Sequence, residues 1–155
     1  MRVAVAFAVL SAAIAAPAAA PVDDSEFRTE AVAILLEKAL SEIEDTHFVC
    51  VSVENAPLLP NTLSRYAADH GRNLGGPAEC VCVEKGDRQV CTRKGFPAVR
   101  ACWLTMFDFR ITSDREAFLT YLVSCGWPEG GGEAVRFEKK EGRWIYAEAV
   151  GRIVL

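Results

Sequence analysis

The sequence has few of the residues and motifs that define common enzymes and nucleic-acid-binding proteins. It contains only two histidines, and it has no Gly-x-Ser-x-Gly, no His-Glu-x-x-His and no phosphate-binding glycine loop that opens a helix. It also lacks an excess of positive charge, because 21 acidic residues outnumber 17 basic residues. A nucleic-acid partner requires a basic face. We therefore expect no nucleic-acid partner, no cofactor and no metal ion.

Long hydrophobic runs are also absent, except for one at the N-terminus. Met1-Arg2 precedes an apolar run over residues 3–14, and Ala16-Pro17-Ala18 supplies the small residues that signal peptidase recognises. The run is too short to span a bilayer, and no cysteine follows it to carry a lipid anchor. The pattern favours a signal peptide over residues 1–18 rather than a buried N-terminal helix, and it leaves one domain over residues 19–155. We expect an exported protein, periplasmic or secreted, with no membrane anchor after cleavage.

Cysteine, in contrast, is well represented, with six residues that all follow the expected cleavage site. An even number of cysteines in a small exported chain is typical of a disulfide framework. If Gly86-Asp87 forms a two-residue hairpin turn, Cys82 lies directly opposite Cys91. Counting outward from the turn places this pair at a non-hydrogen-bonded position, where the two Cα atoms are close enough for a disulfide.

The other four cysteines are paired by weaker arguments. The same count around a turn at Ser113-Asp114 places Cys102 opposite Cys125, although at a hydrogen-bonded position where the fit is looser. Cys50 and Cys80 then form the third disulfide by elimination. This bridge closes the longest loop, and it is expected to contribute about 4 kcal/mol to stability.

The hydrophobic pattern predicts an α+β fold. Residues 23–44 carry apolar side chains four apart, starting at Phe27, which indicates a long amphipathic helix. A short helix is expected over residues 62–70. Short runs of β-branched and aromatic residues separated by turn residues predict strands, at residues 47–53, 79–84, 89–94, 101–112, 118–127, 133–140 and 143–150. In this scheme Gly130-Gly131-Gly132 is a turn. The whole is an N-terminal helix packed on a curved antiparallel sheet, a meander stapled by disulfides.

The segments 49–53, 77–80, 121–132 and 135–144 resemble parts of small exported bacterial proteins of unknown function. Those proteins are similar to cystatin-like or NTF2-like α+β rolls, in which a helix packs on a curved antiparallel sheet. The resemblance extends over about residues 47–150. It implies the Cys50–Cys80 disulfide independently, and it implies no activity, because such folds host enzymes and binders alike.

Five residues are candidates for a pocket in the curved sheet. Asp108 interrupts the mostly apolar run from Trp103 to Phe109, and the aromatic side chains could line a concavity around it, although core packing and an Asp108–Arg110 pair are the simpler interpretation. The candidate pocket residues are Trp103, Phe107, Asp108, Tyr121 and Trp144. A zinc site that combines His70 with cysteines is not favoured, because the spacing is wrong for zinc ligands.

These observations lead to three hypotheses about function. The first is a non-enzymatic exported module that binds a protein or a small apolar ligand through the open face of the sheet, a face that would also allow a homodimer. The second is a hydrolase or isomerase that uses Asp108. The third is a secreted enzyme inhibitor that presents a rigid loop at residues 126–132.

Overall fold

A computed structural model describes residues 24–54, 60–126 and 129–154 of the chain. The expected signal peptide lies outside these residues, as does the expected helix start at residue 23. The elements, in chain order, are α1 (Asp24–Glu42), β1 (Phe48–Val53), α2 (Pro60–His70), β2 (Leu74–Gly75), the short 3₁₀ helix η1 (Pro77–Glu79), β3 (Cys80–Lys85), β4 (Arg88–Arg93), β5 (Phe96–Ser113), β6 (Glu116–Gly126), β7 (Glu129–Lys140) and β8 (Arg143–Val154).

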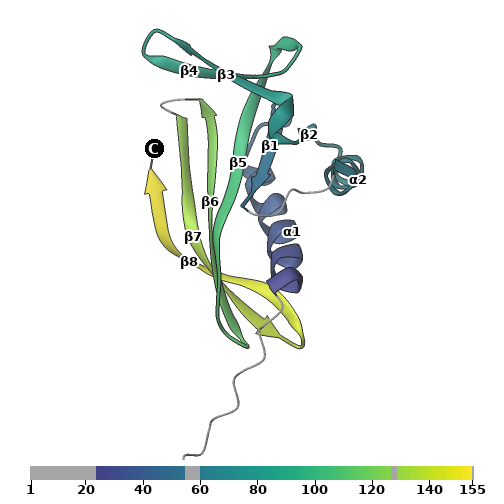
Figure 1. Ribbon diagram of the computed structural model, residues 1–155, viewed down its shortest axis with the longest axis vertical. Helices are drawn as coiled ribbons and strands as arrows, with labels where there is room; N and C mark the ends of the chain where they lie inside the picture. The colour runs from purple at the N-terminus through teal and green to yellow at the C-terminus, as the bar shows by residue number, and fades with distance from the viewer. Residues whose placement is uncertain (1–23, 55–59, 127–128, 155) are drawn as a thin grey trace, which may run out of the picture.

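The strands form an open sheet in the order β2-β1-β5-β6-β7-β8, and the hairpin β3–β4 joins it through β5 (Figure 1). Strands β5 to β8 are antiparallel, as expected for strands joined by short turns. Strand β1, however, runs parallel to both β2 and β5, so the prediction of a wholly antiparallel sheet is wrong. Helix α2 and the β3–β4 hairpin separate β1 from β5 in the chain, and a connection of this length allows the parallel return.

The four strands of the meander are longer than predicted at their ends. Gly130, Gly131 and Gly132 lie inside β7, paired with β6 on one side, so their prediction as a turn is wrong. The last hairpin has a two-residue turn at Glu141-Gly142, because Lys140 faces Arg143 and Phe137 faces Tyr146. Of the two registers that the sequence left open, the structure therefore has the one with the shorter turn.

Helix α1 covers one face of the meander, which we call the helix face; the opposite side is the open face (Figure 1). Phe27, Ala31, Leu35 and Ala39 are fully buried, because their four-residue spacing keeps them on one side of the helix. The rings of Phe27 and Trp144 pack edge to face at 5.0 Å between centroids. The first turn of α1 is thus seated on the last strand of the chain.

A bulge at Asp108 divides β5 into two parts. Asp108 has a left-handed backbone with φ of 56°, and the register of β5 against β6 shifts there. Its N–H donates a hydrogen bond of 2.7 Å to Oε2 of Glu54, at the end of β1. The shift changes which side chains point to the helix face, so Phe109 and Ile111 pack on the core together with Met106.

The turn between β5 and β6 is displaced by one residue from its predicted position, and the bulge compensates for this displacement. The turn lies at Asp114-Arg115, one residue later than predicted, because Ser113 faces Glu116. Register shifts between residues 107 and 113 then restore the predicted register further up the strands. Cys102 and Cys125 come to lie 4.0 Å apart at their Cα atoms, a separation closer to that of a non-hydrogen-bonded pair than of the predicted hydrogen-bonded one.

Three disulfides hold the hairpin and the sheet together, with the predicted pairings Cys50–Cys80, Cys82–Cys91 and Cys102–Cys125. They indicate that the protein forms in an oxidising environment. Together with Trp103, the first two disulfides pack the hairpin against the open face of β1 and β5. In the part of the chain that the structure describes, neither helix is long and apolar enough to cross a bilayer.

Candidate functional site

The five candidate pocket residues are divided between the two faces of the sheet. Tyr121 and Trp144 are buried on the helix face, in the core. Trp103 and Phe107 alternate with the core residues of β5 and therefore point to the open face. Asp108 lies at the bulge, with its carboxylate 3.2 Å from Nε of Arg110. The five side chains therefore do not line a common pocket, since the period of two along a strand separates them.

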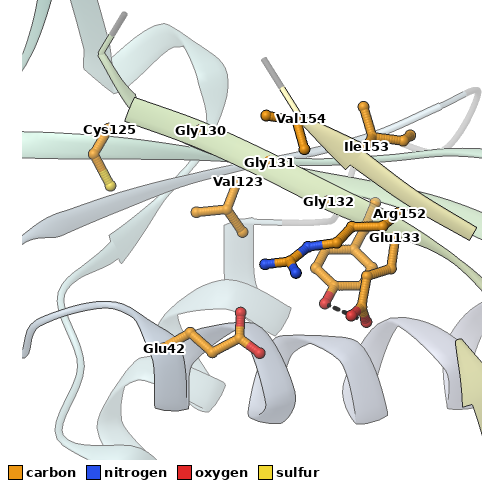
Figure 2. A pocket seen from close by; sticks show the side chains of 11 residues that line it. Glu42, Val123, Cys125, Gly130, Gly131, Gly132, Glu133, Arg152, Ile153 and Val154 are labelled. Atoms are coloured by element: carbon orange, nitrogen blue, oxygen red, sulfur yellow. Dashed lines mark hydrogen bonds between the residues drawn. The ribbon is translucent and has the colours of Figure 1, made fainter. Parts of the chain in front are cut away.

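A cavity does lie on the helix face, at the end of the sheet that α1 does not reach. It has a volume of about 380 Å³ and opens between the last turn of α1 and the ends of β6, β7 and β8 (Figure 2). Of the predicted pocket residues, Tyr121 alone lines it. Among the described residues, the lining consists of Glu42, Tyr121, Val123, Cys125, Gly130, Gly131, Gly132, Glu133, Arg152, Ile153 and Val154.

The floor of the cavity is the glycine run of β7. Gly131 pairs with Val123 and Val154, whose side chains line the cavity, so any side chain at position 131 would enter the same space. A Cβ atom at Gly131 would also meet the carbonyl oxygen of Ile153 at 3.0 Å. One at Gly132 would collide with the carbonyl oxygen of Tyr121. Glycine inside a strand often marks the close approach of a ligand or another backbone, and here the glycines leave the cavity unfilled.

Charged groups line the wall between α1 and the floor. Nζ of Lys38 lies 3.2 Å from Oε1 of Glu42 and 3.2 Å from Oε2 of Glu133. The hydroxyl of Tyr121 donates a hydrogen bond of 3.0 Å to the same Glu133 oxygen. One lysine is thus shared by two carboxylates, and a tyrosine that is buried in the core completes the network.

The network shifts the pKa values of two of its members. Burial would lower the pKa of Lys38, but hydrogen bonds with Tyr121, Glu42 and Glu133 outweigh it and raise that pKa above its ordinary value. Burial raises the pKa of Tyr121 to about 12, although the hydrogen bond with Lys38 opposes the rise. At neutral pH Lys38 is therefore charged and Tyr121 keeps its proton.

Arg152 differs from the other charged residues of the cavity. Its position on β8 faces Glu133 across the strand pair, yet the carboxylate of Glu133 is bound to Lys38 and Tyr121. Among the described residues, no carboxylate lies within 4.0 Å of the Arg152 guanidinium. Figure 2 shows this guanidinium extending over the cavity, toward the space between Val123 and Glu42.

Sequence reasoning missed most of this site. The predicted last strand ends at Val150, short of Arg152, and Lys38 is not among the candidate residues. The glycine run was the available signal, but three glycines in a row are more typical of a turn than of a strand. The strand forms there because β6 and β8 supply pairing partners on both sides.

The alternative zinc site is not formed. His70 stacks on Tyr66 at 4.1 Å between ring centroids, and the cysteines that could have joined it are in disulfides. Within the described ranges, no group of three or more His, Cys, Asp and Glu side chains is arranged to hold a metal ion.

The chain was also compared with known proteins. The resemblance to cystatin-like and NTF2-like rolls stays a prediction, because no protein-family model, no curated protein and no solved structure matches the chain significantly.

Proposed function

We propose that this protein is a non-enzymatic binding module that holds a small ligand in the helix-face cavity. The observation that carries the proposal is the guanidinium of Arg152, which has no carboxylate partner among the described residues, beside a cavity whose other charged groups are paired. The ligand would place an anionic group on Arg152, where a charge-assisted hydrogen bond is available. Its apolar part would lie on the glycine floor, against Val123 and Val154.

The pKa values of Lys38 and Tyr121 argue against either of these groups as a general base. A general base must be deprotonated near the working pH. The raised pKa values of Lys38 and Tyr121 keep both groups protonated at neutral pH. Asp108, the residue of the hydrolase hypothesis, is not among the residues that line this cavity.

The proposal includes export from the cytoplasm. Residues 1–18 have the pattern of a signal peptide, and three disulfides fit a periplasmic or secreted protein. Mass spectrometry of the mature protein from its native compartment tests this part. The expected N-terminus is residue 19, and a chain that retains residues 1–18 would contradict it.

Sodium decanoate is a suitable first probe of the cavity, with decanol and decylamine as uncharged and cationic comparisons. Isothermal titration calorimetry should show decanoate binding more tightly than either. The variant Arg152→Met should weaken decanoate binding about tenfold, which is the effect of losing about 1.4 kcal/mol. Arg143→Met is the matched control, because Arg143 is an exposed arginine on the same strand that pairs with Glu30 away from the cavity.

Two results would overturn the proposal. One is equal binding of decanoate by the protein and by its Arg152→Met variant. The other is the absence of binding by decanoate at concentrations where it remains monomeric. Tighter binding of decylamine would assign the cavity to cations, held by Glu42 and Glu133, and would likewise contradict the role of Arg152.

A further inference from the structure

The hairpin β3–β4 projects beyond the end of the meander, where one of its strands is an edge (Figure 1). Within the described part of the chain, β3 pairs with β4 alone, whereas β4 also pairs with β5. Two disulfides fix the hairpin, one between its strands and one from Cys80 to β1. The edge of β3 is thus fixed in position and has no strand partner in the described part of the chain.

The two faces of the hairpin differ in character. One face carries the cysteines and packs on the sheet, where Nε1–H of Trp103 donates to Sγ of Cys82 at 3.0 Å. The other face, which we call the outer face, carries Val81 and Val83, which are 41% and 46% exposed. Three cross-strand pairs make up the outer face, and they are Val81 with Thr92, Val83 with Val90, and Lys85 with Arg88.

The outer face has basic residues and no carboxylate. Lys85 lies directly opposite Arg88, and like charges in this position repel each other. Among the described residues, neither cation has a carboxylate within 4.0 Å. The surrounding segment, residues 80–100, carries five basic and two acidic residues, whereas the whole chain has a formal net charge of −4. The free protein therefore has uncompensated positive charge next to exposed valines.

The backbone of β3 also offers hydrogen bonds along its free edge. In a hairpin with a two-residue turn, the residues that flank the turn are hydrogen-bonded to each other, and the pattern alternates from there. Cys82 and Cys91 are therefore a non-hydrogen-bonded pair, which agrees with their Cα separation of 4.1 Å. The N–H and C=O groups of Cys82 and Glu84 consequently point away from β4, toward the free edge.

We propose that β3 is a docking edge for an extended segment of a partner protein that carries both aliphatic and acidic side chains. The segment adds a strand to the hairpin through the backbone groups of Cys82 and Glu84. Its aliphatic side chains cover Val81 and Val83, and its carboxylates neutralise Lys85 and Arg88. A second copy of this chain that docked through its own outer face does not meet the requirement, because that face would bring the same positive charges.

A peptide probe tests the proposal directly. The probe is a heptapeptide in which two valines and then two glutamates alternate with threonines, and the comparison peptide has lysine in place of each glutamate. Backbone amide chemical shifts should change along β3 on titration with the glutamate peptide, and its Kd should be at least tenfold lower than that of the lysine peptide.

Two variants at one position separate backbone pairing from side-chain contacts. Glu84→Pro removes the N–H that points to the free edge and leaves the ladder with β4 intact, so it should weaken binding of the glutamate peptide at least tenfold. Glu84→Ala keeps the N–H and should bind within twofold of the unchanged protein. A third variant, Lys85→Glu with Arg88→Glu, should reverse the preference between the two peptides, which tests the charge argument without a proline.

The following outcomes would overturn the proposal. Equal affinity for the glutamate and lysine peptides would show that charge does not contribute to binding. Unchanged binding by a folded Glu84→Pro variant would show that the backbone of the β3 edge does not contribute. Binding to vesicles of phosphatidylglycerol and phosphatidylcholine, without binding to the peptide, would assign the outer face to a membrane surface instead.

Discussion

At the scale of single residues, Gly126 shows how the absence of a side chain joins two parts of the fold. It ends β6 with a φ of 119°, a backbone conformation that residues with a Cβ atom rarely adopt. A Cβ atom at this position would collide with the carbonyl oxygen of Gln89, in β4. The hairpin therefore lies against the end of the meander only because residue 126 is glycine.

We predict that Gly126→Ala lowers the free energy of unfolding by about 2 kcal/mol or more, since the left-handed backbone and the collision both oppose the methyl group. Urea unfolding measures the change. Gly76→Ala is the control and should have a much smaller effect, because Gly76 has a φ of −83° and a Cβ atom there would meet no atom within 4 Å. Equal losses in both variants would show that Gly126 is not required for the contact.

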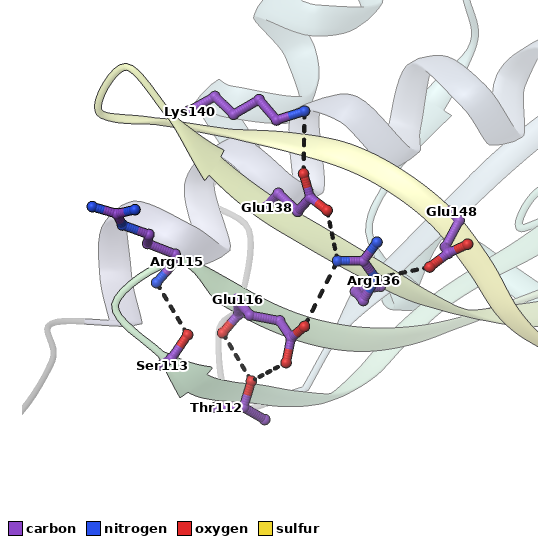
Figure 3. Close-up of polar contacts among 8 residues, drawn as sticks. All are labelled: Thr112, Ser113, Arg115, Glu116, Arg136, Glu138, Lys140 and Glu148. Atoms are coloured by element: carbon purple, nitrogen blue, oxygen red, sulfur yellow. Dashed lines mark hydrogen bonds and ion pairs between the residues drawn. The ribbon is translucent and has the colours of Figure 1, made fainter.

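At the scale of elements, the lower part of the open face is held by a network of charges across three strands (Figure 3). Nη1 of Arg136, on β7, lies 2.7 Å from Oε1 of Glu138 on its own strand and 3.7 Å from Oε2 of Glu116 on β6. Its Nε lies 2.9 Å from Oε1 of Glu148 on β8. Lys140 adds a second cation 3.1 Å from Glu138. The hydrogen bond from Arg136, followed by that from Lys140, lowers the pKa of Glu138 below its ordinary value of 4.5.

A lowered pKa in the folded state makes the contribution of Glu138 depend on pH. Its stabilising effect is complete above the ordinary value of 4.5 and is lost as the pH falls below it, through the lowered pKa. We predict that Glu138→Gln reduces the loss of stability between pH 4.5 and pH 3 and leaves the shape of the curve unchanged above pH 6. Thermal unfolding across this range measures the effect, and an identical acid slope in both proteins would contradict it.

The elements also show what the sequence could and could not predict. The register of β3 against β4 followed from one two-residue turn, and Cys82 faces Cys91 as expected. The parallel position of β1 could not be read in this way, because its partner β5 lies about fifty residues away and no turn connects them. The bulge at Asp108 was missed for a similar reason, since Glu54 at the end of β1 holds it in place. In the cavity, Arg152 could be recognised only once β8 was seen to extend past Val150.

At the scale of the whole molecule, one disulfide joins β1 to the hairpin, one closes the hairpin and one joins β5 to β6. Cys50–Cys80 spans 30 residues, Cys102–Cys125 spans 23 and Cys82–Cys91 spans 9. Longer loops lose more entropy when the unfolded chain is cross-linked, so the three bridges should contribute in the same order.

We predict that the paired variant Cys50→Ala with Cys80→Ala loses about 4 kcal/mol of unfolding free energy, and that Cys82→Ala with Cys91→Ala loses about 3 kcal/mol. Urea unfolding of both variants under oxidising conditions measures the difference. A larger loss in the Cys82–Cys91 variant would show that the hairpin contact on Trp103, rather than loop closure, decides the effect of that bridge.

The packing of Phe27 against Trp144 has a consequence for how the chain is made. Trp144 is synthesised more than one hundred residues after Phe27, on which it packs. Strand β5 is likewise synthesised well after β1, with which it pairs. A nascent polypeptide therefore exposes part of the apolar side of α1 until Trp144 has been synthesised. A chain that ended before residue 144 would lack the indole on which Phe27 packs, so that end of the apolar side would stay exposed and be a target for proteolysis.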